Sequence, residues 1–447
     1  MEKKSDCLEK VSSLVNRAKR AGADDADAIY VEGTSLSLAC RKGKKESLER
    51  SEGMEIGLRV FVGKRQAIVS SSDFTNLGLT NLVERALDMA KVVPEDEFCG
   101  IANEEILARN VPEIESFDKL EPSTEELEAL AFRAEQAALE VEGVSNSEGA
   151  EASWGKSYVA LAATNGFVSG REGSSHSLSV SVLAGKGTAM ERDYDYAVSV
   201  FGEDLEAPEK LGKSAGEKAV ARLNPRKVET AKVPVIFDPR VSNTLISHLS
   251  SAINGAKVAR GLSFLRDEMG AQVFSKQVTI CDDPLKARGL RSKPFDAEGV
   301  MTEKRNLVEG GILKSWILDL RSARQLKLTT TGHASRGPSS TPSPSATNVF
   351  MEAGSINPSD LIKDVKSGFY ITEMIGMGVD GVTGDYSRGA TGFWIENGEL
   401  GFPVSEMTIA GNLKDMFMQL TPANDLNFRF FSNAPTVRID GLTVAGK

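Results

Sequence analysis

Apolar residues in the first hundred positions change from helical to strand spacing and back. Residues 8–21 place apolar side chains three and four positions apart, which predicts an amphipathic helix that stops at Gly22. Four strands are predicted next, at 28–32, 35–40, 54–62 and 66–72, with a hairpin turn at Gly63-Lys64-Arg65. A helix over 77–92, capped by Thr75 or Asn76, then completes an α–β–β–β–β–α order.

The middle of the chain continues the antiparallel pattern. Ser123 and Glu126 have the spacing of a capping box at a helix start. The elements predicted here are a helix over 124–141, strands within 144–202 and a helix over 206–222. Asn165-Gly166 is typical of a hairpin turn between two of these strands.

The second half is richer in short strands and turns. Its predicted elements are a strand at 233–239, a helix over 241–258, alternating strands and turns over 277–320, a strand at 369–375 and a short helix from Asn412 to Leu420. Residues 335–347 are rich in Ser and Pro, which predicts a surface loop. Asn397-Gly398 indicates a further hairpin.

Strands that occur in runs, rather than alternating with helices, predict an α+β fold and not a doubly wound sheet. The 447 residues are enough for two or three domains. We expect an N-terminal region over 1–225 with helices and antiparallel strands, and a β-rich C-terminal domain over 226–447. A Pro- and acid-containing connector at 95–122 leaves a further division of the first region open.

Charge and composition narrow the function classes. The net charge of −10 argues against direct, sequence-independent binding to nucleic acid. The N-terminus lacks the apolar core of a signal peptide, and no apolar run is long enough to span a membrane. The four cysteines show no metal-binding spacing, so we expect free thiols and a cytoplasmic protein.

Two catalytic motifs are weak in this sequence. Residues 376–381 match GxGxxG, but residues 382–394 have no helical period, so a bend between strands is favoured over a dinucleotide site. Ser174, Ser175 and His176 are neighbours in the chain, and a hydroxyl-rich turn is favoured over a nucleophile–base pair. Neither a P-loop nor a GxSxG elbow is present.

Metal chemistry depends on three histidines, His176, His248 and His333. A hydrolytic zinc site needs three protein ligands, and two histidines on a helix must share one face. His248 lies on a predicted helix but is followed by Leu249, and Ile253 stands five positions on, so no second imidazole accompanies it. We therefore predict no metal site there, and we expect His333 to be a loop histidine.

The block 384–412 is dense in glycine and polar groups, which is typical of tightly turned strands. Four charged side chains of this block are candidates for a polar set: Asp385, Arg388, Glu396 and Glu406. The sequence leaves open whether they face a substrate or form an internal ion-pair network. The basic run 41–45 is predicted to be a solvated hairpin turn.

These residues resemble the TldD/PmbA family (peptidase U62 type), and within it the PmbA (TldE) branch. The similar stretches are PVIFDP at 234–239, KPFDAEGVMTEKRNLVEGGIL at 293–313, SARQLKLTTTGHA at 322–334 and GDYSRGATGFWIENGELGFPVSEMTIAGNLKDM at 384–416. The resemblance covers essentially the whole chain and is most specific in its last 70 or so residues.

The resemblance implies a subunit of a heterodimeric zinc metalloprotease that degrades small or unfolded polypeptides, with links to microcin maturation and DNA gyrase modulation. The TldD-type partner carries zinc through HExxxH and a C-terminal cysteine. Here Leu249 and Ile253 stand where that motif has Glu and His, and no cysteine follows Cys281. The resemblance therefore implies a non-catalytic chain with no catalytic residue and no cofactor of its own.

For such a subunit, we expect the 376–392 loops to face the partner and to enclose the peptide. The cleft residues expected are Gly378, Asp385, Arg388, Gly389 and Glu396. A glycine-rich strand edge could also pair with an extended peptide. Two alternatives remain: a regulatory protein acting on gyrase-linked partners, and a self-sufficient hydrolase. Whether the isolated chain forms a homodimer also stays open.

Overall fold

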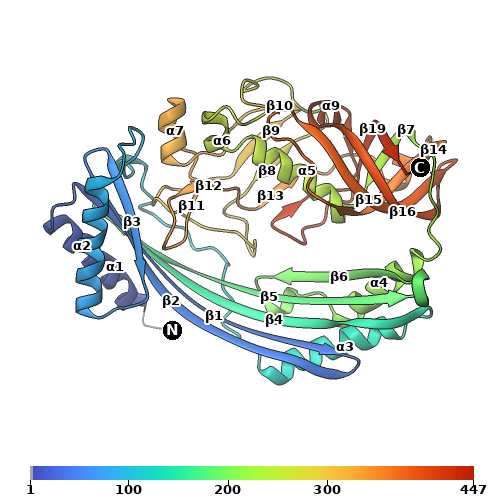
Figure 1. The fold of residues 1–447 in the computed structure, drawn as a ribbon, viewed down its shortest axis with the longest axis horizontal. Helices are drawn as coiled ribbons and strands as arrows, with labels where there is room; N and C mark the ends of the chain where they lie inside the picture. Colours follow the sequence, from blue (N-terminus) through green and yellow to red (C-terminus); the bar gives the residue numbers. More distant parts are fainter. Residues whose placement is uncertain (1–3, 447) are drawn as a thin grey trace.

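The computed structural model describes residues 4–446, and the two halves of the chain are built on different sheets (Figure 1). The N-terminal half is a long curved sheet with helices, and the C-terminal half lies along one side of it. Helices and mostly antiparallel strands occur in both halves, and the C-terminal half is mostly β. The predicted α+β class is confirmed.

The N-terminal sheet is antiparallel, with the strand order β3-β2-β1-β4-β5-β6. Its strands are β1 (Asp25–Arg41), β2 (Lys44–Val62), β3 (Arg65–Ser71), β4 (Val144–Ala163), β5 (Val168–Ala184) and β6 (Glu191–Ser199). The predicted break between strands at 28–32 and 35–40 is wrong, because both belong to β1. Gly33 lies opposite Gly53 on one side and Ser157 on the other, so its backbone stays paired through the glycine.

Four helices cover one face of this sheet: α1 (Lys4–Arg20), α2 (Asn76–Val92), α3 (Thr124–Leu139) and α4 (Pro208–Ala221). Side chains alternate between the two faces of a strand. In β1, Ala28 and Tyr30 pack with α1 and α2, whereas Ile29 packs with Phe295 of the C-terminal half. The sheet therefore has a helix-covered face and a face that looks toward the C-terminal half (Figure 1).

Local signals place several of these elements. Ser123 and Glu126 form the predicted capping box of α3, and Thr75 caps α2 by accepting from the Gly78 N–H. The hairpin at Asn165-Gly166 joins β4 to β5 as predicted. These predictions succeeded because each depends on hydrogen bonds between residues close in sequence.

The C-terminal half contains a small barrel. Its sheet has the order β16-β15-β14-β7-β19-β17, and β16 also pairs with β19, which closes the ring. The strands are β7 (Ala231–Phe237), β14 (Ser367–Ile375), β15 (Asp385–Glu396), β16 (Glu399–Asn412), β17 (Leu420–Pro422) and β19 (Val437–Ala445). The turn at Asn397-Gly398 joins β15 to β16 as predicted. No helix follows the GxGxxG segment 376–381, because β15 begins at Asp385.

Short strands and helices complete this half. They are β8 (Ile280–Asp282), β9 (Arg305–Glu309), β10 (Ile312–Leu313), β11 (Ala334–Ser335), β12 (Ser343–Pro344), β13 (Val349–Met351), β18 (Ser432–Asn433), α5 (Pro239–Ala252), α6 (Gly255–Ala259), α7 (Leu320–Leu326), α8 (Pro358–Ile362) and α9 (Leu413–Met418). The single helix predicted over 241–258 is wrong. Asn254 accepts from the Ala256 N–H and so caps a new helix, which separates α6 from α5.

Residues 335–347 are not the free surface loop that their composition predicts. The Arg336 side chain is fully buried and forms an ion pair with Asp27 of β1 at 2.5 Å. The carbonyl of Pro338 lies so close to Gly57 of β2 that a Cβ there would meet it at 2.0 Å. This segment therefore packs the C-terminal half onto the N-terminal sheet, through contacts that composition cannot reveal.

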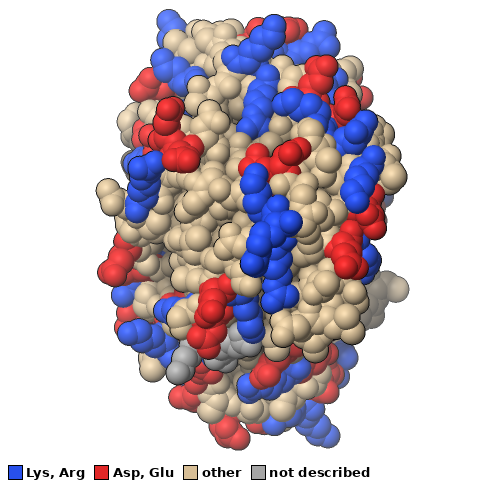
Figure 2. Space-filling model, turned by 90° about the vertical axis from the view of Figure 1, so that its left-hand side faces the viewer, with Lys and Arg blue, Asp and Glu red and all other residues tan. Residues whose placement is uncertain are grey.

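The end of the molecule that carries α1 and α2 has a mixed charge (Figure 2). Lys and Arg side chains form a narrow column there, and Asp and Glu side chains interrupt it. This face offers no broad cationic surface, in keeping with the net charge of −10. Within residues 4–446, no helix is long and apolar enough to cross a membrane.

Candidate functional site

Helix α5 carries the position at which the sequence predicts an altered metal motif. Its start is well defined, because Pro239 occupies the first turn and the Asp238 carboxylate accepts from the Arg240 N–H. Leu245 and Leu249 are fully buried in the core of the C-terminal half. The helix is thus held by its apolar face, and His248 lies to one side of that face.

His248 sits against the start of β15. Its ring meets Tyr386 edge-on, with 5.8 Å between ring centres. Nε2 is buried and has no hydrogen-bond partner among the residues described. Burial, and then the nearby Arg388 charge, lower the pKa of His248 to about 4. At neutral pH this imidazole is therefore uncharged.

The side chains around His248 do not fit a zinc ion. Leu249 and Ile253 are both 0 % exposed and pack into the core, so neither position faces the imidazole with a donor atom. The Arg388 guanidinium acts on His248 with positive charge, which disfavours a second cation. In the described part of the chain, no three His, Cys, Asp or Glu side chains lie together as a metal site requires.

Arg388 ties the glycine-rich loop to β15. Its Nε donates to the Gly376 carbonyl at 2.8 Å, and the Ser387 N–H donates to the Gly378 carbonyl at 2.7 Å. A Cβ on Gly378 would lie 1.9 Å from the Ser387 carbonyl oxygen, so only glycine fits there. Arg388 therefore holds the loop in a defined conformation close to His248.

The five expected cleft residues are not all at one place. Gly378, Asp385, Arg388 and Gly389 belong to the loop and the first part of β15. Glu396 ends that strand, and the 12 residues of β15 span roughly 35 Å. Glu406 forms a separate exposed ion pair with Lys227. Within the part of the chain that the structure describes, Asp385, Arg388, Glu396 and Glu406 form no ion pair with one another, so the internal ion-pair network is not formed.

The glycine-rich strand β15 is not an edge. It pairs with β14 on one side and with β16 on the other. The expectation that an extended peptide could add to this strand is therefore wrong for β15 itself. A peptide at this end of the barrel would have to contact the 376–384 loop and exposed side chains.

Ser174 and His176 lie within strand β5 and not in the predicted turn. The Ser174 hydroxyl donates to the Val200 carbonyl at 2.9 Å and accepts from the Asp118 N–H at 2.7 Å. His176 Nε2 lies 3.3 Å from the Asp118 carboxylate, and burial lowers the pKa of this histidine. Both side chains thus fasten neighbouring segments to β5, which leaves no free Ser–His pair.

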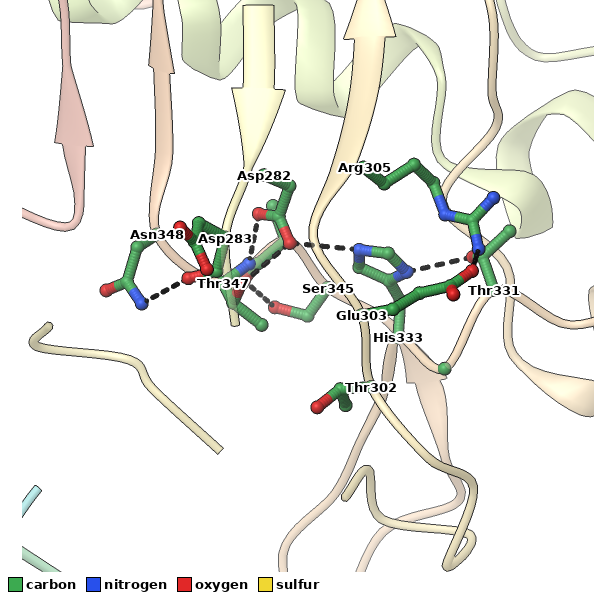
Figure 3. Close-up of polar contacts among 12 residues, drawn as sticks. Asp282, Asp283, Thr302, Glu303, Arg305, Thr331, His333, Ser345, Thr347 and Asn348 are labelled. Carbon is green, nitrogen blue, oxygen red and sulfur yellow. Dashed lines mark hydrogen bonds and ion pairs between the residues drawn. The ribbon is translucent and has the colours of Figure 1, made fainter. Parts of the chain in front are cut away.

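His333 is in a loop as predicted, but it is buried between two polar partners (Figure 3). Nε2 lies 3.1 Å from the Asp282 carboxylate, and Nδ1 lies 2.8 Å from the Thr331 hydroxyl. Although burial alone would raise the pKa of Asp282, hydrogen bonds from His333 and Thr347 hold it below its usual range. The Leu318 N–H also donates to Thr331, so this chain of groups is enclosed and acts in packing.

A larger feature has no motif in the sequence. A cavity of about 850 Å³ lies between the helix-free face of the N-terminal sheet and the segments 289–297, 334–336 and 345–347. Arg171 of β5 and Lys293 line it. The alternation of small polar residues along β5 was the one signal for an open sheet face. Arg171 and Lys293 lie too far apart in the chain to be paired by spacing.

Models of one protein family match most of the chain. The PmbA/TldA metallopeptidase domain 1 matches residues 26–90, the central domain matches 117–223 and the C-terminal domain matches 230–446. Together these three matches cover both sheets and helix α5.

Individual relatives agree with the family models. The metalloprotease PmbA of Escherichia coli O157:H7 is 36% identical, over 100% of this chain and 98% of its own length. A crystal structure from Bacteroides thetaiotaomicron, described as a putative modulator of DNA gyrase, matches 100% of both chains with a TM-score of 0.91 at 24% identity. TldE from Thermococcus kodakarensis matches 98% of this chain and 100% of its own, with a TM-score of 0.84 at 20% identity. The chain therefore belongs to the PmbA/TldD metallopeptidase family, in its PmbA (TldE) branch.

Proposed function

We propose that this chain is the TldE-type subunit of a zinc metalloprotease complex that degrades small or unfolded polypeptides. Its TldD-like partner would hold the zinc, and this chain would hold none. The observation that supports this most directly is the set of side chains at α5: His248 stands alone, while Leu249 and Ile253 are buried in the core. Three protein ligands cannot be assembled there without rebuilding the helix packing.

The contribution of this chain would be one wall of the peptide cleft. The 375–382 segment exposes three apolar side chains, Ile375 (62 %), Met377 (87 %) and Val382 (51 %). Exposed apolar groups gathered on one loop are typical of an interaction surface. The loop is held in shape by Arg388, so it can present these groups without being ordered first.

The proposal is tested by purifying the chain alone and together with its TldD-like partner. Zinc per chain is measured in each preparation, and cleavage of an unfolded peptide is assayed. We expect no stoichiometric zinc and no cleavage with this chain alone, and both with the complex. Stoichiometric zinc and cleavage by the isolated chain would overturn the proposal.

The role of the loop is tested with Arg388→Gln, which removes the hydrogen bond to Gly376. Arg109→Gln is the matched control, because Arg109 is exposed and its ion pair with Glu104 is long, at 3.9 Å. We expect about tenfold weaker complex formation or cleavage for the first variant and no change for the control, as for an interface arginine. Unchanged assembly and unchanged cleavage by Arg388→Gln would remove this loop from the cleft wall.

A further inference from the structure

The cavity between the two halves has a floor of small side chains. The floor residues come from positions of β1, β4 and β5 that face away from the helices, and they include Gly33, Ser35, Gly155, Ser157 and Gly173. Small residues leave room above the sheet, whereas the opposite face of the same strands is packed with α1–α4. The space is therefore formed by the sheet itself, and the C-terminal half closes it from above (Figure 1).

Arg171 lines this space without a partner. Among residues 4–446, no hydrogen bond, ion pair or aromatic contact of its guanidinium is formed, and burial lowers its pKa. Arg171 is partly exposed, and its guanidinium has five N–H donors that no described residue accepts. The unused N–H donors of Arg171 are thus available to a ligand in the cavity.

Lys293 faces the same space from the C-terminal half. Lys293 is 9 % exposed, and its ammonium donates to one carbonyl, that of Ala334, at 3.1 Å. Burial and the charges of Arg171 and Arg291 lower the pKa of Lys293, while Asp296 works against them, and the result is about 8. Arg171, Arg291 and Lys293 all line the same cavity.

Two other cations of the cavity wall are neutralised by carboxylates, and a third, Arg291, lies over the ring of Phe431. Arg336 pairs with Asp27, and Lys156 pairs with Glu121. The one buried carboxylate of the wall, Asp296, accepts three backbone N–H groups, from Glu298, Val300 and Ala334. It forms no ion pair with Lys293 within 4.0 Å among the described residues, so it is already occupied as an acceptor.

We propose that this cavity binds an oxyanion, a carboxylate or phosphate group, between Arg171 and Lys293. A cation that is removed from water without a counter-charge costs stability, and an anionic ligand would recover that cost. The planar guanidinium can bind two oxygens of such a group at once, and the ammonium adds a third donor. Ligand pockets also occur preferentially where two parts of a protein meet.

The proposal is tested on the isolated full-length chain by calorimetric titration at constant ionic strength. The probes are inorganic phosphate, and an acetylated tri-alanine peptide with either a free or an amidated C-terminus. Binding of the free peptide but not of its amide identifies the carboxylate as the ligand, and binding of phosphate identifies the phosphate group. Either result supports the site, and no binding of any probe overturns it.

The variants are Arg171→Met and Lys293→Met, with Arg109→Met and Lys314→Met as matched controls. The control cations are exposed and lie outside the cavity wall. We expect the cavity variants to bind about 10- to 100-fold more weakly, as for the loss of a charge-assisted hydrogen bond, and the controls to bind as the unmodified chain does. Equal losses in cavity variants and controls would reduce the effect to general charge and overturn the site.

Thermal unfolding separates a ligand site from a structural role. An unpaired cation adds no ion pair to the fold, so Arg171→Met should unfold at the same or a higher temperature. A clearly lower unfolding temperature would mean that Arg171 holds the fold together, and it would overturn the inference. The proposal is independent of the protease-subunit role and goes beyond it. These measurements need neither the partner nor zinc, so their outcome does not depend on that role.

Discussion

His248 is partly buried and Lys293 is buried, in different parts of the molecule, and burial lowers the pKa of both with opposite results at neutral pH. The pKa of His248 falls to about 4, so the imidazole is neutral and needs no counter-ion. The pKa of Lys293 falls to about 8, so the ammonium is still mostly charged. The α5 position is therefore neutral and apolar, whereas the cavity retains positive charge.

The difference comes from the starting values and not from the degree of burial. Histidine titrates near 6.5 in water and lysine near 10.4, so a similar downward shift carries only the first below neutral pH. A buried histidine can be accommodated by losing its proton. A buried lysine at pH 7 has to find hydrogen-bond acceptors, which is why the cavity and not α5 points to a ligand.

The largest expected effect breaks the apolar side of this comparison. Leu249→Glu restores one residue of the zinc-helix pattern, but it places a carboxylate at a fully buried position. We expect a loss of at least about 3 kcal/mol in the free energy of unfolding, because no partner is available for the charge. Urea unfolding measures it, and Leu249→Met, with a similar volume, should cost less than about 1.5 kcal/mol. A stable, zinc-binding Leu249→Glu variant would contradict our description of α5.

The second-largest effect is expected for Lys293→Met, which should change how the free energy of unfolding depends on pH. Lys293 has a folded pKa of about 8 and an unfolded pKa near 10.4, so the unfolded chain binds more protons between these values. The stability of the unmodified chain should therefore rise from pH 8 to pH 10.5. The variant should be more stable below pH 8, by at most about 3 kcal/mol, and the advantage should disappear near pH 10.5. If the stability difference between the unmodified chain and the variant were the same at pH 8 and at pH 10.5, the buried charge on Lys293 would be refuted.

His248→Gln should show the same kind of effect in a lower window. The folded pKa of about 4 lies below the unfolded value near 6.5, so the unmodified chain loses stability as the pH falls from 6.5 to 4. The loss is at most about 3 kcal/mol, and less because His248 is partly exposed. Comparing the denaturation midpoints of the two proteins across this range isolates it. A variant that loses as much stability as the unmodified chain would show that His248 is already protonated or solvated.

The smallest expected effect concerns the coupling between His248 and Arg388. Burial is the larger cause of the low pKa of His248, and the Arg388 charge is the smaller. Arg388→Gln should therefore raise the pKa of His248 by less than about one unit. The chain has three histidines, so their ring signals can be followed individually by NMR titration. A return of the pKa to about 6.5 would mean that charge, and not burial, dominates.

Local sequence signals predicted the elements that depend on near neighbours. The capping box at Ser123, the hairpins at Asn165-Gly166 and Asn397-Gly398, and the start of the short helix at Asn412 all occur as expected. Failures occurred where distant pairing decides. Gly33 continues a strand because two neighbouring strands hold it, and residues 335–347 are ordered by contacts with β1 and β2.

The sequence by itself determined the family and the absence of Glu and His at Leu249 and Ile253, because these are matters of residue identity at a known spacing. Only the tertiary structure decided which charges are paired. Arg171 and Lys293 come from different halves of the chain and share one cavity, while Arg336 and Lys156 nearby have partners. Charge pairing depends on distances across the fold, and those distances are set by the packing of the two sheets and not by local sequence.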